Sequence, residues 1–273
     1  MKMSFKKFIS YFGVSLLSFF LVLTLTTLVI HKVKSKQELD SLKEKGYYNL
    51  VSVGDYSLNV ALFGNRESEN VIVCIAGLGS GDFAVSMRQM TSDLEKENLL
   101  VFIDRARYGL SEDTNKDLTN ANIVEDYRLV LKNLEINGPY ILMPHSIGGA
   151  YANYWCTKYP EEIKAVVFID GSQLSENAFD EYEDEKVTLG DKLLQTFAKM
   201  GFSRYVIHNY FYHLPSNYTD EEQYLADALM YKTFESIAPI NEACLIKQNG
   251  KEAFEMITPN NIPKLYICSS WGF

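Results

Sequence analysis

The chain has 273 residues, of which 47% are hydrophobic and 22% are charged, a composition typical of a folded globular protein and not of a disordered one. Its net charge of −9, from 26 basic and 35 acidic side chains, argues against nucleic acid as a partner because no extended basic face can be assembled. Four cysteines, at positions 74, 156, 244 and 268, lack the spacing of a metal site, and we expect no metal and no cofactor.

The N-terminus carries one long uncharged segment. Residues 8–30 contain no charged side chain, and at ~1.5 Å per helical residue they are long enough to cross a hydrocarbon layer of ~30 Å. A cleaved signal peptide needs a shorter apolar core and small residues before the cut, whereas this segment ends in Leu-Val-Ile-His-Lys. We therefore expect a single-pass membrane anchor. Lysines lie on both sides of it, but the short lysine-bearing tail before it favours an extracytoplasmic globular part.

A charged segment and then the globular domain follow the anchor. Residues 31–46 are charged, and we expect a juxtamembrane helix or linker there. The globular domain then occupies residues 47–273. Residues 47–53 and 57–63 alternate between apolar and polar side chains around a Gly-Asp pair, which predicts a β-hairpin.

Strand and helix patterns alternate from residue 71 onward. Residues 71–76 and 99–103 are continuous apolar runs, the pattern of strands buried on both faces. A helix is predicted near 122–134, and further strands at 140–143 and 165–169. A hairpin followed by strand–helix units predicts an α/β fold with a mostly parallel sheet and helices on both faces.

One strand-to-helix corner lies at the centre of this pattern. The strand after Pro139 breaks at His145-Ser146-Ile147, and a helix follows through two glycines. A serine at such a corner presents its hydroxyl at the tip of a turn. The N–H of Ile147, at a helix N-terminus, is then available to stabilise an oxyanion.

Two other features follow strands of the same sheet. A glycine-rich loop, residues 77–81, follows the first buried strand, and Asp170 follows the strand at 165–169. Ligands bind at the carboxyl ends of strands in such sheets, so we expect the loop, Ser146 and Asp170 to converge. A phosphate site is the alternative for the loop, but the Lys-Ser/Thr end of a P-loop is missing.

The corner resembles the nucleophile elbow, Gly-x-Ser-x-Gly, of the α/β-hydrolase superfamily, with Pro144 in place of the first glycine. Residues 76–81 resemble that family's oxyanion loop, and 104–111 its Asp-Arg-x-Gly-x-Gly-x-Ser turn, which has a structural role. The resemblance implies a serine hydrolase acting on a carboxylic ester or related acyl substrate. Ser146 would be the nucleophile, and the N–H groups of Leu78 and Ile147 would form the oxyanion hole.

The remaining chain departs from the strand–helix rhythm. Residues 174 to about 256 are rich in acidic and aromatic side chains, and the superfamily carries a helical cap at this place. The aromatic residues form either the core of the cap or a substrate wall. Residues 264–269 read as a last strand.

The family's order of catalytic residues is Ser, acid, His, and its histidine follows an eighth strand. This sequence has no histidine after position 213, and we expect none of its four to be the base: His31, His145, His208 and His213. The acid is either Asp170, which is alternatively a turn former, or a residue beyond 273. We therefore expect a chain lacking its last strand, C-terminal helix and catalytic histidine. The alternatives are an inactive binding protein with the hydrolase fold or a truncated gene product.

Overall fold

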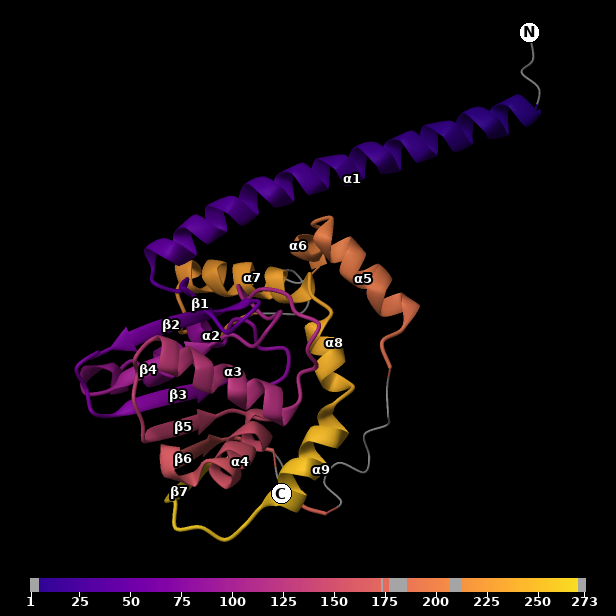
Figure 1. The fold of residues 1–273 in the computed structure, drawn as a ribbon. Helices are drawn as coiled ribbons and strands as arrows, with labels where there is room; N and C mark the ends of the chain where they lie inside the picture. Colours follow the sequence, from indigo (N-terminus) through magenta and orange to yellow (C-terminus); the bar gives the residue numbers. More distant parts are fainter. Residues whose placement is uncertain (1–4, 173, 177–185, 207–212, 270–273) are drawn as a thin grey trace.

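The computed structural model describes residues 5–172, 174–176, 186–206 and 213–269 (Figure 1). Its strands are β1 (Leu50–Ser52), β2 (Ser57–Gly64), β3 (Val71–Ile75), β4 (Leu99–Ile103), β5 (Tyr140–Pro144), β6 (Ile163–Ile169) and β7 (Lys264–Ile267). Its helices are α1 (Phe5–Glu44), α2 (Phe83–Thr91), α3 (Asn120–Asn133), α4 (Gly148–Lys158), α5 (Leu189–Lys199), α6 (Ser203–Val206), α7 (Asp220–Phe234), α8 (Ala238–Ala243) and α9 (Ile246–Met256).

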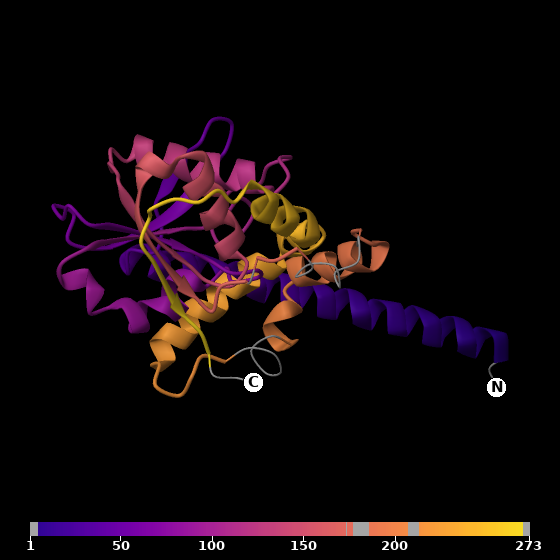
Figure 2. The same ribbon diagram turned by 90° about the horizontal axis from the view of Figure 1, so that it is seen from below.

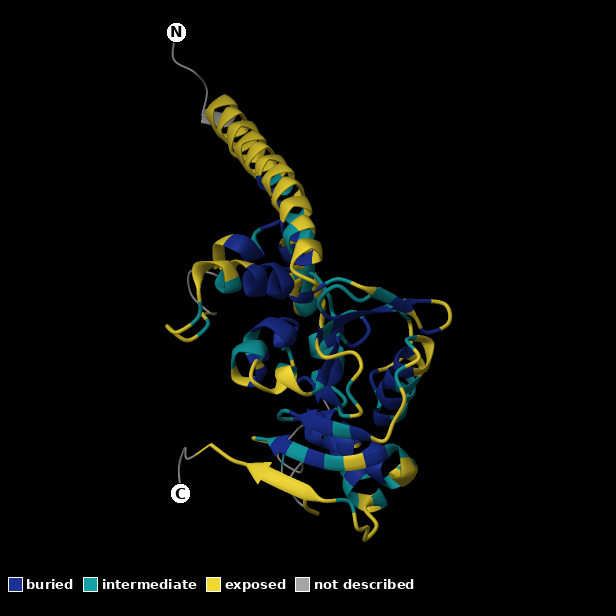
Figure 3. Ribbon diagram, turned by 90° about the vertical axis from the view of Figure 1, so that its left-hand side faces the viewer, coloured by how far each residue is buried: buried dark blue, intermediate teal, exposed yellow. Residues whose placement is uncertain are grey.

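The strands of the described residues form one sheet in the order β1-β2-β4-β3-β5-β6-β7. The pairs β1–β2 and β2–β4 are antiparallel, and every later pair is parallel. In register, Val73 of β3 lies opposite Val101 of β4 and Leu142 of β5. This confirms the predicted hairpin and the mostly parallel sheet. The edge strand β7 is exposed along its whole length (Figure 3).

Two hydrophobic cores lie on the two faces of the sheet. Side chains alternate between faces along a strand, so a continuous apolar strand serves both cores. In β3, Val73 packs into one core and Cys74 into the other. β4 divides in the same way, with Val101 on the first face and Phe102 on the second. This explains why these strands show no polar alternation in the sequence.

Helices cover both faces (Figures 1 and 2). The first core includes buried residues of α3, α4 and α9, and the second those of α2 and α7. The arrangement therefore differs from the expected cap at 174–256. Within that segment α7 and α9 belong to the cores of the sheet, whereas α5 and α6 pack against each other and against α7, and Arg204 of α6 pairs with Glu38 of α1.

The helix α1 runs without a break from Phe5 to Glu44, so the helix alternative holds for residues 31–44. It is long and apolar enough to cross a membrane, and its N-terminal half projects from the domain with its side chains exposed (Figure 3). Its C-terminal half packs on the domain, where Leu42 is buried in the second core beside α7. One helix thus contains both the candidate anchor and part of the globular core.

Candidate active site

Ser146 lies at the corner between β5 and α4, at the carboxyl end of the strand. Its φ is 51°, a left-handed conformation that costs a non-glycine residue about 1–3 kcal/mol and persists only when its surroundings hold it. The Ser146 N–H donates to the Ile169 carbonyl at 3.3 Å, and the Ser146 carbonyl accepts from the N–H groups of Gly149 (2.9 Å) and Ser172 (3.0 Å). The neighbouring strand and the first turn of α4 thus fix the serine in this conformation.

The first residue of α4 lies against β3. A Cβ atom added to Gly148 would be 2.8 Å from the Ile75 carbonyl oxygen and 3.2 Å from that of Ala76. A Cβ atom on Gly149 would meet nothing closer than 3.6 Å. Close approach of helix and strand therefore requires glycine at position 148 and does not require it at 149.

The glycine-rich loop after β3 lies directly beside the corner. A Cβ atom on Gly77 would be 3.1 Å from Ser146 Cβ and 2.9 Å from His145 Nδ1. In the described part of the chain, the N–H groups of Leu78 and Ile147 donate to no backbone or side-chain acceptor. Leu78 is partly exposed, and Ile147 begins the turn into α4. The two predicted donors therefore come from adjoining segments and are both available to an external acceptor.

Arg105 holds this loop in place, a role that sequence analysis did not assign. Its guanidinium donates to the Ala76 and Gly77 carbonyls, each at 2.7 Å, and pairs with Glu242 at 3.2 Å. Glu242 also accepts from the Tyr151 hydroxyl. The Arg105 and Glu242 side chains are almost completely buried. Together they join the loop, α4 and α8, and the residue spacing of the turn at 104–111 was the only sequence signal for Arg105.

The turn at 104–111 has the structural role that the resemblance implied. Asp104 accepts from Asn59 Nδ2 at 3.0 Å and from the Leu110 N–H at 3.1 Å. Burial raises the pKa of Asp104 to about 6, although both hydrogen bonds act in the opposite direction. The Tyr108 hydroxyl accepts from the Gly79 N–H at 3.3 Å, so the turn also supports the glycine-rich loop.

Asp170 lies at the end of β6, next to the corner. It has a φ of 44° and an exposed side chain. Its carboxylate accepts from the hydroxyl of Ser269 at 3.0 Å and from the Ser269 N–H at 3.4 Å. The preceding residue, Ile169, forms a β-bridge with His145 and accepts from the Ser146 N–H. Asp170 is therefore near the serine along the sheet edge, and the segment after β7 holds its carboxylate.

The described histidines do not form a hydrogen-bonded triad with Ser146 and Asp170. The His145 ring stacks on Phe83 with centroids 5.9 Å apart, and its Nδ1 is buried without a partner in the described ranges. Burial lowers the pKa of His145, and the charge of Asp170 opposes this shift. His31 lies on α1, where it contacts Arg204 and Glu235. His213 is exposed, and His208 lies outside the described residues.

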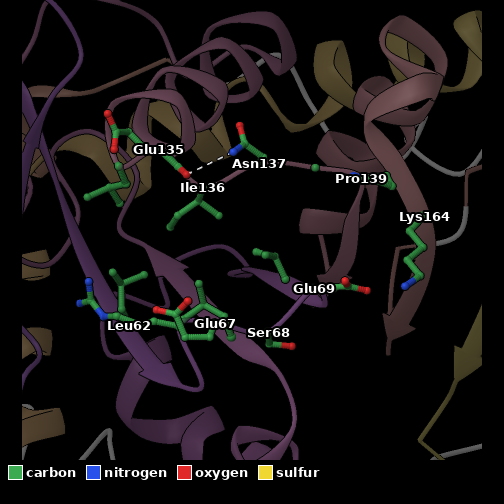
Figure 4. A pocket seen from close by; sticks show the side chains of 14 residues that line it. Leu62, Glu67, Ser68, Glu69, Glu135, Ile136, Asn137, Pro139 and Lys164 are labelled. Atoms are coloured by element: carbon green, nitrogen blue, oxygen red, sulfur yellow. Dashed lines mark hydrogen bonds between the residues drawn. The ribbon is translucent and has the colours of Figure 1, made fainter.

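A large surface pocket lies at the end of the sheet opposite to Ser146, where the parallel strands begin (Figure 4). It has a volume of about 650 Å³ and is lined at the amino ends of strands by Val71, Leu99 and Lys164. Ser146 is at the carboxyl end of its strand, so this pocket does not belong to the candidate active site. Across the described ranges, no group of three or more His, Cys, Asp or Glu side chains is arranged to hold a metal ion.

Comparisons with known proteins agree with this geometry. Residues 70–216 match the family model described as alpha/beta hydrolase fold. The uncharacterized protein YbdG of Bacillus subtilis (strain 168) is 30% identical over 261 residues, which cover 93% of this chain and 78% of YbdG.

Solved structures of low sequence identity show the same fold. A putative lipase from Acinetobacter baumannii AYE has a TM-score of 0.55 at 17% identity, covering 85% of this chain and 77% of that one. The epoxide hydrolase VrEH1 from Vigna radiata has a TM-score of 0.57 at 17% identity, covering 81% and 78%. With the strand order, the Ser146 corner and the family match together, the chain belongs to the alpha/beta hydrolase fold family.

Proposed function

We propose that this protein is a membrane-anchored serine hydrolase that acts on a carboxylic ester or a related acyl substrate. The observation that carries the proposal is the left-handed Ser146 at the corner of β5 and α4, beside two backbone N–H groups without acceptors in the described chain. A strained residue that its surroundings hold in place points to a functional site. The solved neighbours include a putative lipase and an epoxide hydrolase, and a serine at the corner favours acyl chemistry.

The proposed reaction is acyl transfer to serine. The Ser146 oxygen attacks the substrate carbonyl while a histidine takes the hydroxyl proton, and Asp170 orients that histidine. The tetrahedral oxyanion accepts hydrogen bonds from the N–H groups of Leu78 and Ile147. The histidine then returns the proton to the leaving alcohol, and water releases the acid from the acyl-enzyme.

The geometry favours neither His31 nor His145 as that base. His31 contacts Arg204 and Glu235 beside α1, and the His145 ring packs against Phe83. His208 and His213 are the candidates within the chain that can be tested by substitution. Without a base, the oxyanion hole and binding alone leave a rate of only ~10³–10⁴ over water.

The test is turnover of a short-chain p-nitrophenyl ester by the full chain and by Ser146→Ala, together with covalent labelling by a fluorophosphonate. The proposal predicts that Ser146→Ala loses both turnover and label, with unchanged circular dichroism. Serine-dependent turnover near ~10 s⁻¹, the median for enzymes, would show that a base is present, and His208→Ala and His213→Ala would then identify it. Turnover that survives in Ser146→Ala would refute the assigned nucleophile.

A catalytically inactive binding protein with the same fold is the second candidate. It is favoured by one observation, that the Asp170 carboxylate accepts hydrogen bonds from Ser269, whereas His31 pairs with Arg204 and Glu235 and the His145 ring stacks on Phe83. Absence of both label and turnover, with an acyl ligand still bound in calorimetry, would support this candidate over the hydrolase.

The anchoring part of the proposal concerns α1. Residues 8–30 would span the bilayer, and the globular domain would lie outside the cytoplasm. Protease added to intact cells should then digest the domain, whereas digestion that requires cell lysis would reverse the orientation.

A further inference from the structure

The helix α5 carries an apolar face that points away from the domain. Leu189, Leu193 and Phe197 follow one another at intervals of four residues, so they lie along one side of the helix. Leu194 borders this side, and all four side chains are more than half exposed. We call these four residues the α5 apolar face. Soluble proteins rarely leave such a contiguous face in water.

The opposite side of α5 is attached to the domain. Ala198 is buried, and Gln195 donates to the Glu235 carbonyl at 3.1 Å. The charged side chains Asp191, Lys192 and Lys199 also lie away from the apolar face, because the rotation of about 100° per helical residue places them on the other side of the helix. α5 is therefore strongly amphipathic and is held with its apolar side outward.

The end of α5 touches α1 at the boundary of the uncharged segment. A Cβ atom on Gly201, just after α5, would be 2.5 Å from His31 Cβ and 3.0 Å from the Thr27 carbonyl oxygen. Thr27 and His31 mark the end of the segment 8–30. The position of this contact places the end of α5 level with the membrane boundary that α1 defines.

A buried ionic cluster fixes this contact. Arg204 of α6 forms a bidentate pair with Glu38 of α1, one bond of which measures 2.7 Å, and donates from Nε to His31 Nδ1 at 2.9 Å. His31 Nε2 lies 3.0 Å from Glu235 Oε1, next to α7. Breaking one partner of a buried pair is costly, so this cluster holds α6, which follows α5 directly in the chain, against α1.

We propose that α5 lies in the membrane interface, with its apolar face among the upper acyl chains of the lipid. This rests on the proposed anchoring of α1. Figures 1 and 2 both show α5 on the side of the domain from which the N-terminal half of α1 projects. An amphipathic helix in this position buries its apolar side ~5–10 Å into the boundary between headgroups and acyl chains.

A lipid surface is the binding partner that the position of α5 favours, because the turn after α5 lies against the end of the uncharged segment of α1. Val29, Ile30 and Val33 of α1, close in sequence to this contact, also have exposed apolar side chains. Lys192 and Lys199 of α5, and three lysines at the end of the α1 span, would lie at the level of lipid phosphates. The consequence is that the membrane anchors this protein at two elements, α1 and α5, and thereby restrains the domain's rotation about α1.

The test uses single tryptophan substitutions in the full chain, reconstituted in vesicles of phosphatidylcholine and phosphatidylglycerol. Phe197→Trp probes the α5 apolar face, and its native exposure of 53% is matched by 56% for Leu265 on β7, which supplies the control Leu265→Trp. Leu17→Trp, inside the span, reports deep insertion. Emission of each is compared with that of the parent chain, with and without phospholipid brominated near the carbonyl end of its acyl chains.

We expect Phe197→Trp to show blue-shifted emission that the brominated lipid quenches, while Leu265→Trp is not quenched. Quenching of Leu17→Trp without quenching of Phe197→Trp would overturn the α5 inference and leave the anchoring intact. Loss of quenching at both positions, with the protein extracted by alkaline carbonate, would overturn the anchoring and the inference that rests on it. Equal quenching of Phe197→Trp and Leu265→Trp would also overturn it, since such contact would not be specific to α5.

Discussion

Gly148 and Gly149 are the first two residues of α4. We expect alanine at these neighbouring positions to change the free energy of unfolding in opposite directions. Alanine at position 148 places a Cβ atom 2.8 Å from the Ile75 carbonyl oxygen, closer than real Cβ atoms approach backbone oxygen. Neither partner can rotate away, because one is helix backbone and the other is a β3 carbonyl. Overpacking of this kind costs about 1–3 kcal/mol, so we expect Gly148→Ala to lower the free energy of unfolding by that amount.

Alanine at position 149 meets only ordinary contacts, at 3.6 Å from Phe168 Cδ1 and from the Ser172 backbone nitrogen. The substitution also reduces the conformational freedom of the unfolded chain, which stabilises a protein by about 0.4–1 kcal/mol where the native backbone suits alanine. We therefore expect Gly149→Ala to raise the free energy of unfolding slightly. The pair isolates the effect of close approach, since the two positions are neighbours in one helix.

The measurement is urea unfolding in mild detergent, followed by tryptophan fluorescence, to which the buried Trp155 on α4 contributes. Midpoints at equal slope report the stability difference between the variants. Any ester turnover that the parent chain shows should fall more in Gly148→Ala than in Gly149→Ala, because a shifted α4 moves the Ile147 N–H with it. Equal stability of Gly148→Ala and Gly149→Ala would refute the argument that close packing on β3 requires glycine at 148.

Three further predictions concern the Arg105–Glu242 pair, the Asp104 carboxyl group and the candidate membrane segment. Glu242→Gln leaves the buried Arg105 charge without its partner and should lower the free energy of unfolding by about 3–5 kcal/mol. The control Asp93→Asn removes an exposed pair with Lys96 and should not change stability measurably. The raised pKa of Asp104, about 6, means that the folded state binds the proton more tightly than the unfolded state. Stability should therefore fall as pH rises from about 4 to about 6, by roughly 3 kcal/mol from this residue, and Asp104→Asn should flatten that slope in pH-dependent unfolding. The protein should also stay in the membrane fraction after alkaline carbonate extraction; a soluble form beginning near His31 would contradict the anchor.

Much of the fold was determined by local sequence pattern. The strands at 71–75 and 99–103 follow from apolar runs, since a strand buried on both faces has no polar side to show. The corner at Ser146 could be predicted because its strand, turn and helix are contiguous in the sequence. The structure confirms that Ser146 lies at the carboxyl end of β5. The uncharged run at 8–30 predicts a helix long enough to cross a membrane, but α1 is longer than this run because it continues to Glu44 and packs Leu42 into the second core.

Only the tertiary structure decided the partners of the charged groups. Arg105 and Glu242 are separated by 137 residues, and Arg204 and Glu38 by 166, so no local spacing predicts either pair. The same holds for α7 and α9, whose helical pattern is local, whereas the face of the sheet that each one covers depends on the path of the chain between them. Side-chain periodicity specifies which side of a helix or strand is buried. Long-range packing specifies which other element covers that side, and the contacts that support the glycine-rich loop depend on this packing.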